Sequence, residues 1–589
     1  MAFRTLYEMF SSTVSKYPDK TALMVKKEGR YVPITYKEMK KNIDNLSRGL
    51  YFLGAKKGDK ISLLSENRPE WVYSDLAMQK LGIANVPIYT TLAPAEIEYL
   101  VNNSESTMII VSNERFLKTI LSIINRLPKI RYIIVFDDFA PSLKSDQVLS
   151  LKDVLNIGAQ NSHLEKAVEE LHNSVGRDDL ASIVYTSGTT GNPKGAMLTQ
   201  GNFLSNCEGC EKVTALYDTD IALSFLPLSH TFERIVYYMC ILRGATIAYA
   251  ESIDTVAQNL VEVKPTIMAA VPRMFEKMYA RILENVEKLP EKKKKIFYSA
   301  IETGKEFWKQ KEQGKVKFGT KIKYALMTKL VFKKIHERVG GRIRFFVSGG
   351  APLSPDLAKI YRAMGFTILE GYGLTETSPV LTVNRPDSIV IGSVGLPLPN
   401  VEIKIAPDGE ILARGPNIMK GYYNMPDATK AAIDDEGWFH TGDIGKLDEK
   451  GYLYITDRKK EIIVMSTGKK VAPQPIENLL KANKYITNVM LIGDNRNYIT
   501  ALVVPNFDTL KTWCREHNIV DENPQTLVKN EKVLSFYNKL IDEATKDFAS
   551  YEKIKKITLL PKDFTMVESF IRNISTLLKQ CMRRENGKR

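Results

Sequence analysis

The segment Tyr185-Thr-Ser-Gly-Thr-Thr-Gly-Asn-Pro-Lys-Gly195 decides the interpretation of this chain. It follows the apolar run Ala181–Val184, which predicts a strand. Its glycines permit tight turns and a close approach of the backbone to a ligand, and Lys194 adds a mobile positive charge. Further hydroxyl donors come from Ser187, Thr189 and Thr190. A loop with many N–H and O–H donors and one lysine suits a polyphosphate.

This loop is not a Walker A loop, which would read G-x-x-x-x-G-K-[ST]. Pro193 precedes its lysine, Gly195 follows it, and the glycine spacing differs. Glycine and threonine alone would favour a polar hairpin or a surface turn. The Pro-Lys-Gly ending favours phosphate binding over that simpler interpretation.

Helix and strand patterns alternate between residues 34 and 136. Thr35-Tyr-Lys-Glu38 is a capping-box pattern, and Gly54 predicts the end of the helix that follows it. The apolar face of this helix consists of Met39, Ile43, Leu46, Leu50 and Leu53. Strands are predicted at Lys60–Ser65, Ala84–Ile88, Met108–Val111 and Tyr132–Phe136, with helices near Pro69 and after Pro94. The alternation predicts an α/β domain with mostly parallel strands.

Two later strands lead into glycine-rich turns. Ile343–Ser348 runs into Gly349-Gly350-Ala351-Pro352, and Thr367–Leu369 runs into Glu370-Gly371-Tyr372-Gly373. Ligands bind beyond the carboxyl ends of parallel strands, so both turns are candidate binding segments. Tyr372 offers a flat face for a nucleotide base, although a buried core position is the simpler interpretation of a lone tyrosine. The glycine- and proline-rich stretch 392–421 predicts a small barrel-like subdomain.

The composition indicates an ordinary globular protein with acidic partners. Among 589 residues, 44% are hydrophobic and 26% charged, and five cysteines argue against a disulfide framework. The formal net charge of +15 suits a nucleotide, CoA, anionic lipid or nucleic acid. No nucleic-acid-binding motif is present, so nucleic acid is not expected as a partner. No secretory signal or spanning apolar run is recognised, which predicts a cytoplasmic protein or one bound only at a membrane face.

Residues 281–340 are rich in lysine with interleaved apolar and aromatic residues. Such helices are commonly solvated covers over a core. They also suit the surface of an anionic membrane, and both interpretations stay open.

Six motifs in order resemble the AMP-forming acyl-adenylating enzymes, which comprise acyl-CoA synthetases, luciferases and adenylation domains. They are Tyr185–Gly195, Leu226–Arg234, Ser348–Leu353, Gly371–Pro379, Gly437–Asp443 and Asp457–Ile462. Together they are far more specific than any one motif. The Glu233-Arg234 ending and the basic helical insertion at about 281–340 resemble the long-chain fatty acid–CoA ligases in particular.

The resemblance implies a site for ATP, Mg²⁺, CoA and a fatty acid. Catalytic roles are implied for Lys194, Thr375, Glu376 and Lys579, with Glu376 holding Mg²⁺, which prefers carboxylate oxygen. His230 is implied in the carboxylate and acyl region. The implied nucleotide-binding residues are Thr186, Ser187, Gly188, Thr189, Thr190, Gly191, Lys194, Gly349, Gly350, Ala351, Pro352, Gly371, Tyr372, Gly373, Thr375, Asp443 and Arg458.

The resemblance also divides the chain into an AMP-binding domain, residues 1–456, and a small mobile α+β lid, residues 457–589, with a hinge near Lys460. The family places a catalytic lysine in the lid, near a Leu-Thr-Pro-Thr-x-Lys-x-x-Arg pattern. Here the stretch Phe564–Arg583 departs from that pattern, and Lys579 is the nearest candidate, shifted by about two positions.

The expected activity is AMP-forming ligation of a long-chain fatty acid to CoA through an acyl-AMP. Two alternatives remain at this stage. One is a fatty acyl-AMP ligase that loads an acyl carrier protein. The other is a nucleotide- or lipid-binding homologue whose altered C-terminal stretch has impaired catalysis. Chain-length preference and oligomeric state do not follow from the sequence.

Overall fold

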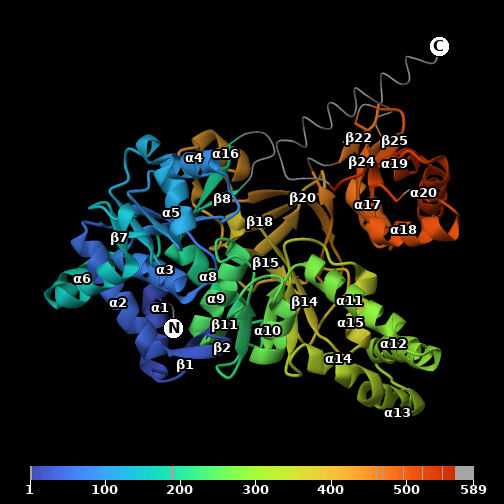
Figure 1. Ribbon diagram of the computed structural model, residues 1–589, viewed down its shortest axis with the longest axis horizontal. Helices are drawn as coiled ribbons and strands as arrows, with labels where there is room; N and C mark the ends of the chain where they lie inside the picture. The colour runs from blue at the N-terminus through green and yellow to red at the C-terminus, as the bar shows by residue number, and fades with distance from the viewer. Residues whose placement is uncertain are drawn as a thin grey trace. The chain divides into compact units, whose positions relative to one another are not determined.

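The computed structural model describes residues 3–186, 192–459, 462–466, 469–494, 496–520, 522–546 and 548–563. These residues belong to two compact units (Figure 1). The first comprises residues 1–441 and 446–454, and the second comprises residues 442–445 and 455–589. The chain therefore changes units within two consecutive strands, β20 (Phe439–Leu447) and β21 (Leu453–Arg458).

One large sheet of the first unit has eight strands in the order β19-β9-β8-β4-β3-β5-β6-β7. Strands β8, β4, β3, β5, β6 and β7 run parallel, and β8 returns through the antiparallel strand β9. The bounds are β3 (Lys60–Leu64), β4 (Ala84–Ile88), β5 (Met108–Val111), β6 (Tyr132–Val135), β7 (Val148–Ser150), β8 (Leu180–Thr186), β9 (Lys194–Thr199) and β19 (Gly421–Tyr422).

The other large sheet has nine strands in the order β16-β15-β14-β13-β12-β10-β11-β1-β2. Its centre, from β14 to β1, is parallel, and both margins are antiparallel. The bounds are β1 (Thr21–Lys27), β2 (Arg30–Thr35), β10 (Ile221–Ser224), β11 (Thr246–Tyr249), β12 (Ile267–Ala270), β13 (Phe345–Ser348), β14 (Ile368–Gly373), β15 (Val380–Val383) and β16 (Leu396–Pro397).

The two large sheets share one hydrophobic core, which explains their apolar sequences. Alternate residues of a strand point to opposite faces of its sheet. In β5, Met108 and Ile110 join the shared core, whereas Ile109 and Val111 join a second cluster. In β12, Ile267 joins the shared core and Met268 a third cluster. A strand buried on both faces reads as a continuous apolar run, as the sequence indicated.

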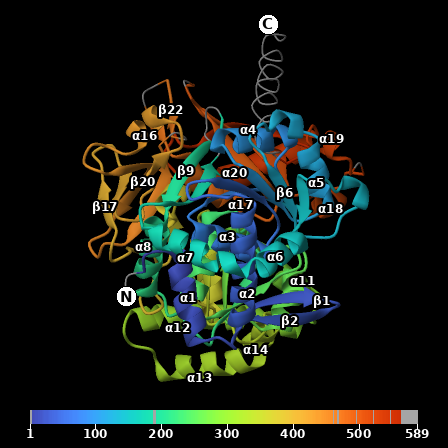
Figure 2. The ribbon, with the colours of Figure 1, turned by 90° about the vertical axis from the view of Figure 1, so that its left-hand side faces the viewer.

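Helices surround these sheets (Figure 2). The predicted capping box is confirmed: the Thr35 hydroxyl accepts from the Glu38 N–H at 3.2 Å, and the Glu38 carboxylate accepts from the Thr35 N–H at 2.8 Å. The bounds are α1 (Leu6–Lys16), α2 (Tyr36–Phe52), α3 (Pro69–Leu81), α4 (Pro94–Ser104), α5 (Glu114–Leu121), α6 (Leu151–Gln160), α7 (Glu165–Ser174), α8 (Gln200–Glu211), α9 (Thr231–Arg243), α10 (Val256–Val263), α15 (Pro355–Ala363) and α16 (Pro426–Ala432).

The lysine-rich region forms a helical layer at the rim of the first unit (Figures 1 and 2). It consists of α11 (Pro272–Glu287), α12 (Glu291–Glu312), α13 (Phe318–Met327), a π-helical segment (Thr328–Phe332) and α14 (Lys333–Arg338). No helix in the described part of the chain is long and apolar enough to cross a membrane.

The stretch predicted as a barrel-like subdomain contributes to a four-stranded sheet in the order β17-β18-β20-β21. Its first strands are β17 (Glu402–Ile405) and β18 (Glu410–Arg414). The second unit has its own core around β24, β25 and β26, with β24 antiparallel and β26 parallel to β25. Its elements are β22 (Ile463–Val464), β23 (Lys470–Val471), α17 (Pro473–Lys481), β24 (Ile486–Ile492), β25 (Ile499–Pro505), α18 (Phe507–Glu516), α19 (Pro524–Leu527), α20 (Glu531–Ala544) and β26 (Ile554–Leu559). The predicted α/β class, with a small α+β unit after the large one, is confirmed.

Candidate active site

The carboxyl ends of four parallel strands bring separate motifs to one edge of the nine-stranded sheet. Ser348 lies beside Ala270 of β12 and beside Glu370 of β14, and β10 pairs with β12. The segments containing His230 and Gly349 therefore leave the sheet at the same edge, where Gly371 lies in the carboxyl-terminal part of β14. This is where parallel sheets bind ligands.

His230 lies at the N-terminus of α9, where its ring accepts a hydrogen bond. Nδ1 of His230 accepts from the N–H of Phe232 at 3.1 Å. Burial lowers the pKa of His230, which favours the neutral ring. Because Nδ1 is the acceptor, the neutral ring carries its proton on Nε2. His230 thus offers one N–H donor without carrying a charge.

The turn after β13 needs glycine where it passes α9. A Cβ on Gly349 would lie 3.3 Å from the ring of Phe232, and Gly350 has a positive φ of +79°. Gly350, Ala351 and Pro352 are exposed, so their backbone is accessible to a ligand. Ser354 occupies the N-cap position of α15, but its side chain makes no capping hydrogen bond.

Glu376 joins the two large sheets at the centre of the candidate site. It belongs to the short 3-10 helix Thr375–Thr377 that follows β14, and only 8% of its surface is exposed. Its Oε1 accepts from the hydroxyl of Tyr422 at 2.9 Å and from that of Thr186 at 3.4 Å. Burial, with the neighbouring Glu376 carboxylate, raises the pKa of Tyr422, so its hydroxyl stays a donor.

Lys194 adds the positive charge of this cluster. It pairs with Thr186 across β8 and β9, and its Nζ lies 5.0 Å from the ring centroid of Tyr422. A buried carboxylate that accepts from two hydroxyls, with an ammonium beside the ring of one of them, is a set of groups that fits a hard cation together with phosphate. The chain thus brings together Thr186, Lys194 and Glu376, three residues implied by separate motifs.

Tyr422 was missed by the sequence reasoning. It lies 46 positions beyond Glu376, in β19, which pairs with β9 at Ala196. The one available signal was the pair Gly421-Tyr422 after a glycine-rich stretch, and a tyrosine there reads as a core residue.

The Gly371–Gly373 segment is shaped by its neighbours in the sheet. A Cβ on Gly373 would lie 1.8 Å from the carbonyl oxygen of Pro379, so no other residue fits there. Tyr372 is half-buried and packs against the shared core. Thr375 is also half-buried and opens the 3-10 helix that carries Glu376.

In the second unit, Asp443 and Arg458 lie together. The Arg458 Nε is 3.3 Å from Asp443 Oδ1, with Arg458 exposed and Asp443 buried. Adjacent backbone supports the pair, because the N–H of Lys459 donates to the carbonyl of Gly442 at 2.8 Å. The two residues implied near one sugar are therefore neighbours. Ser187, Gly188, Thr189, Thr190, Gly191, Lys460 and Lys579 lie outside the described residues.

Glu233 and Arg234 are adjacent in the sequence but have different surroundings. Arg234 is fully buried, forms an ion pair with the buried Asp75 and donates to Ser182 Oγ at 2.9 Å. It is thus a structural cation of the core. Glu233 lies one turn into α9, and burial raises its pKa to about 8. It is therefore protonated at neutral pH.

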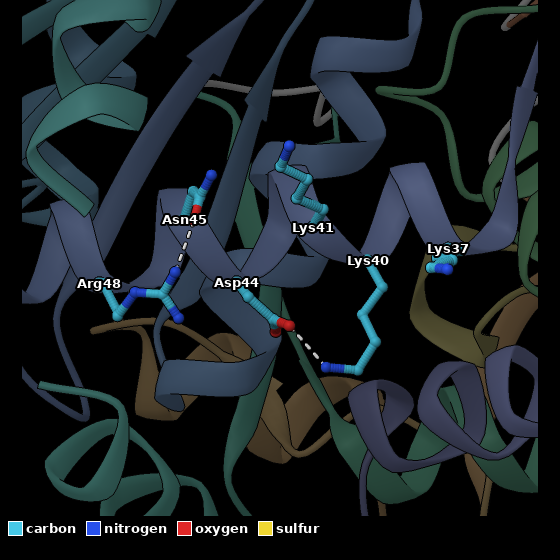
Figure 3. Close-up of a pocket in the computed structure, with 6 residues that line it drawn as sticks. All are labelled: Lys37, Lys40, Lys41, Asp44, Asn45 and Arg48. Atoms are coloured by element: carbon cyan, nitrogen blue, oxygen red, sulfur yellow. Dashed lines mark hydrogen bonds and ion pairs between the residues drawn. The ribbon is translucent and has the colours of Figure 1, made fainter. Parts of the chain in front are cut away.

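A pocket along α2 contains none of the motif residues (Figure 3). It is lined by Lys37, Lys40, Lys41, Asp44, Asn45 and Arg48. Figure 3 shows Lys40 turned toward Asp44 and Arg48 toward Asn45. Arg48 also pairs with Glu165, and Asp44 with Lys80 of α3. These charges hold α2 against its neighbouring helices.

Two family models match nearly the whole chain. An AMP-binding enzyme model matches residues 10–423, and an AMP-binding enzyme C-terminal domain matches residues 460–569. A long-chain-fatty-acid–CoA ligase of Mycobacterium bovis is 32% identical over 91% of this chain and 88% of its own length. A peroxisomal long chain acyl-CoA synthetase of Arabidopsis thaliana is 32% identical over 95% of this chain and 82% of its own.

Solved structures share the fold. An anthranilate CoA ligase in complex with anthranoyl-AMP superposes with a TM-score of 0.75 at 21% identity, covering 99% of both chains. A fatty acyl CoA synthetase of Mycobacterium tuberculosis superposes with a TM-score of 0.64 at 24% identity, covering 97% of this chain and 98% of its own. With the extent of the family models and the identity to curated relatives, these matches give one conclusion: the chain belongs to the AMP-binding enzyme family.

Proposed function

We propose that this chain is an AMP-forming long-chain fatty acid–CoA ligase. The observation that carries the proposal is the cluster at Glu376. The hydroxyls of Thr186 and Tyr422 donate to its buried carboxylate, and the Lys194 ammonium lies beside the ring of Tyr422. Relatives named long-chain-fatty-acid–CoA ligase support the choice of acyl substrate.

The reaction explains why such a cluster is needed. A carboxylate is a poor acyl donor because its leaving group would be oxide. Attack of the fatty acid carboxylate on the α-phosphate of ATP forms an acyl-AMP and releases pyrophosphate. The CoA thiolate then attacks the acyl carbonyl, and AMP leaves. The first step brings an anion to an anion, so it depends on charge neutralisation and positioning.

The residues of the first unit take complementary roles in this proposal. Lys194 and the loop before it hold the β- and γ-phosphates, and the Thr186 hydroxyl and Thr375 lie beside them. Glu376 is the residue that would hold Mg²⁺, and Tyr422 orients its carboxylate through the 2.9 Å hydrogen bond. Bound there, Mg²⁺ would offset the negative charge of the phosphates. His230 donates a hydrogen bond from its Nε2–H to the carboxylate of the fatty acid.

The nucleoside of ATP is held by the remaining motif residues. The backbone of Gly349, the exposed backbone of Gly350–Pro352 and the flat ring of Tyr372 contact adenine. Gly371 and Gly373 flank that ring in the chain. Asp443 accepts hydrogen bonds from the ribose hydroxyls, and Arg458 orients that carboxylate. Lys579 is proposed as the lysine that meets the acyl carboxylate, with Lys460 as the hinge of residues 457–589. Cytoplasmic placement, at most on the cytosolic face of a membrane, completes the proposal.

Product analysis tests this function. The purified chain is incubated with palmitate, ATP, Mg²⁺ and CoA, and the products are identified by mass spectrometry. We expect palmitoyl-CoA, AMP and pyrophosphate. Palmitoyl-AMP alone, with transfer to a phosphopantetheinylated carrier protein, would replace the proposal with the carrier-loading ligase. ATP binding without any product would indicate a homologue impaired in catalysis.

A further inference from the structure

One line of exposed apolar side chains follows the outer face of α13 and its π-helical continuation. It consists of Phe318, Ile322, Leu326 and Leu330, which are 78%, 55%, 50% and 52% exposed. These residues, named here the α13 stripe, are spaced four apart, so they form one line along a helix. At 1.5 Å per residue the line is roughly 18 Å long.

The opposite face anchors this helix to the first unit. Tyr324 stacks on Phe307 of α12 at 4.2 Å between ring centroids, and Phe332 is fully buried. In α14, His336 stacks on Phe366 and its Nε2 lies 2.8 Å from the carbonyl oxygen of Met364. The helix is thus held on one side, and Figures 1 and 2 show α13 at the rim of the first unit, with no described element of that unit outside it.

Basic residues accompany the stripe. Residues 315–338 contain seven lysines and one arginine against a single glutamate. Lys321 and Lys329 follow Phe318 and Leu326 by three positions, so they lie beside the stripe. Both are exposed, and no ion pair of either lysine is found among the described residues. An apolar line edged by uncompensated cations therefore faces outward.

We propose that the α13 stripe docks the protein on the anionic surface of a membrane. Its apolar side chains would enter the boundary between headgroups and acyl chains, while the lysines contact lipid phosphates through their long stems. Charge complementarity favours an anionic lipid surface. The apolar side chains of the stripe can enter such a surface, and its negative charge attracts the lysines beside them. The helix lies along the surface and does not cross the bilayer. This inference does not rest on the proposed reaction, although a docked enzyme would meet fatty acids where they partition.

Vesicle flotation of the full-length chain tests the proposal. The vesicles contain phosphatidylcholine alone or phosphatidylcholine with about one third phosphatidylglycerol. We expect binding to the anionic vesicles to exceed binding to the neutral ones by about tenfold or more, and to weaken as NaCl is raised. Equal binding to both vesicle types would overturn the role of the lysines and with it the proposal.

Two variants separate the apolar and charged contributions. Ile322→Ser with Leu326→Ser, and Lys321→Glu with Lys329→Glu, should each lower apparent affinity for anionic vesicles by about tenfold. The matched controls are Ile253→Ser with Val261→Ser, and Lys166→Glu with Lys212→Glu, which change exposed side chains elsewhere. Both controls should bind as the unmodified chain does.

Unaltered vesicle binding by both stripe variants would overturn the proposal. Sedimentation velocity distinguishes another occupant: if the serine variant turns a dimer into a monomer and still binds vesicles, the stripe contacts a second copy instead. Because all four substituted positions are exposed, thermal unfolding midpoints should match that of the unmodified chain. Acyl-CoA formation from a short, water-soluble fatty acid should also be unchanged, since these residues are outside the proposed active site.

Discussion

Glu376 is buried and accepts two side-chain hydrogen bonds. Because glutamine has nearly the same shape and its amide oxygen also accepts hydrogen bonds, a substitution can test the charge of Glu376 alone. Glu376→Gln keeps the volume and still accepts from Tyr422, but it removes the negative charge. We expect pyrophosphate release to fall by about 100-fold or more, because preorganised charge is the main catalytic contribution at such sites. The measurement is pyrophosphate release from ATP and palmitate, with thermal unfolding as a check on the fold.

Tyr422→Phe is the matched control for Glu376→Gln. It removes the hydroxyl that orients the carboxylate and retains the carboxylate itself, so its loss of rate should be about tenfold and smaller than that of the glutamine variant. Near-normal pyrophosphate release by Glu376→Gln would contradict the assigned role of this residue.

Lys194 is the second residue whose charge should be essential. Lys194→Ala removes the ammonium near Tyr422 and should cut adenylation by about 100-fold or more, with most of the loss in kcat/KM for ATP. The comparison is Lys212→Ala, which removes an exposed lysine beyond α8. Equal steady-state rates for the two variants would refute a phosphate-binding role for Lys194.

Glu233 predicts a specific dependence of stability on pH. Burial raises its pKa from 4.5 to about 8 in the folded chain. Between these values the folded state keeps a proton that the unfolded state has released, so this group lowers the free energy of unfolding as pH rises. The contribution is about 1.4 kcal/mol per pH unit within that window.

Glu233→Gln removes this titration and should flatten the profile. Urea unfolding at pH 5, 6, 7 and 8 should show the variant gaining stability relative to the unmodified chain as pH rises, with no further gain above about pH 8. Glu170→Gln changes an exposed carboxyl and should leave the profile unaltered. Parallel profiles for Glu233→Gln and the unmodified chain would show that Glu233 is already ionised at neutral pH.

At the scale of elements, a buried lysine fastens four helices together. The side chain of Lys80 in α3 is fully buried and pairs with Asp44 of α2 and with Glu165 and Glu169 of α7. Its Nζ also lies 5.1 Å from the ring centroid of Tyr7 in α1. Removing one member of a buried charge network leaves the others without compensation.

Lys80→Met should therefore lower the free energy of unfolding by about 3 kcal/mol or more. Arg243→Met breaks a half-exposed ion pair with Glu211 and should cost less than about 1 kcal/mol. Urea unfolding of both variants at pH 7 makes the comparison. A similar loss in both would mean that water reaches Lys80 and screens the network.

Some elements of the fold could be predicted from the sequence, and others could not. Local patterns predicted the capping box at Thr35 and the strands β4 and β5 with their bounds, because neighbouring residues decide them. The buried charges of Lys80, Asp75 and Arg234 were not predicted. A charged residue is expected at the surface, and the partners of these three lie on helices that are distant in the sequence. Tyr422 was missed for the same reason: only pairing of β19 with β9 brings it to Glu376.

At the scale of the whole molecule, the order of the motifs predicted the fold. The residues at which the chain passes from one compact unit to the other are seen only in the structure. The sequence suggested a division after residue 456. In the structure, residues 442–445 and 455–456 also group with the second compact unit, although β20 and β21 begin in the first. No local pattern at Asp443 or Arg458 reveals this grouping.

Separate cores predict separate unfolding. The two apolar clusters of the second unit draw their members from residues 463–560, and the three clusters of the first unit contain none of them. Scanning calorimetry of the full chain should therefore show two transitions. ATP with Mg²⁺ at about 100 times its dissociation constant should raise the transition of the first unit by about 2 °C.

Two truncated chains identify the transitions. A chain ending at Arg458 keeps β20, β21 and the pair Asp443–Arg458, so it should reproduce the first transition and its response to ATP. A chain ending at Thr441 cuts β20 within the four-stranded sheet and should unfold at a lower temperature. The prediction is wrong if the full chain shows a single transition and the chain ending at Arg458 does not show it. The two units would then unfold together, and contacts outside the separate apolar clusters would couple them.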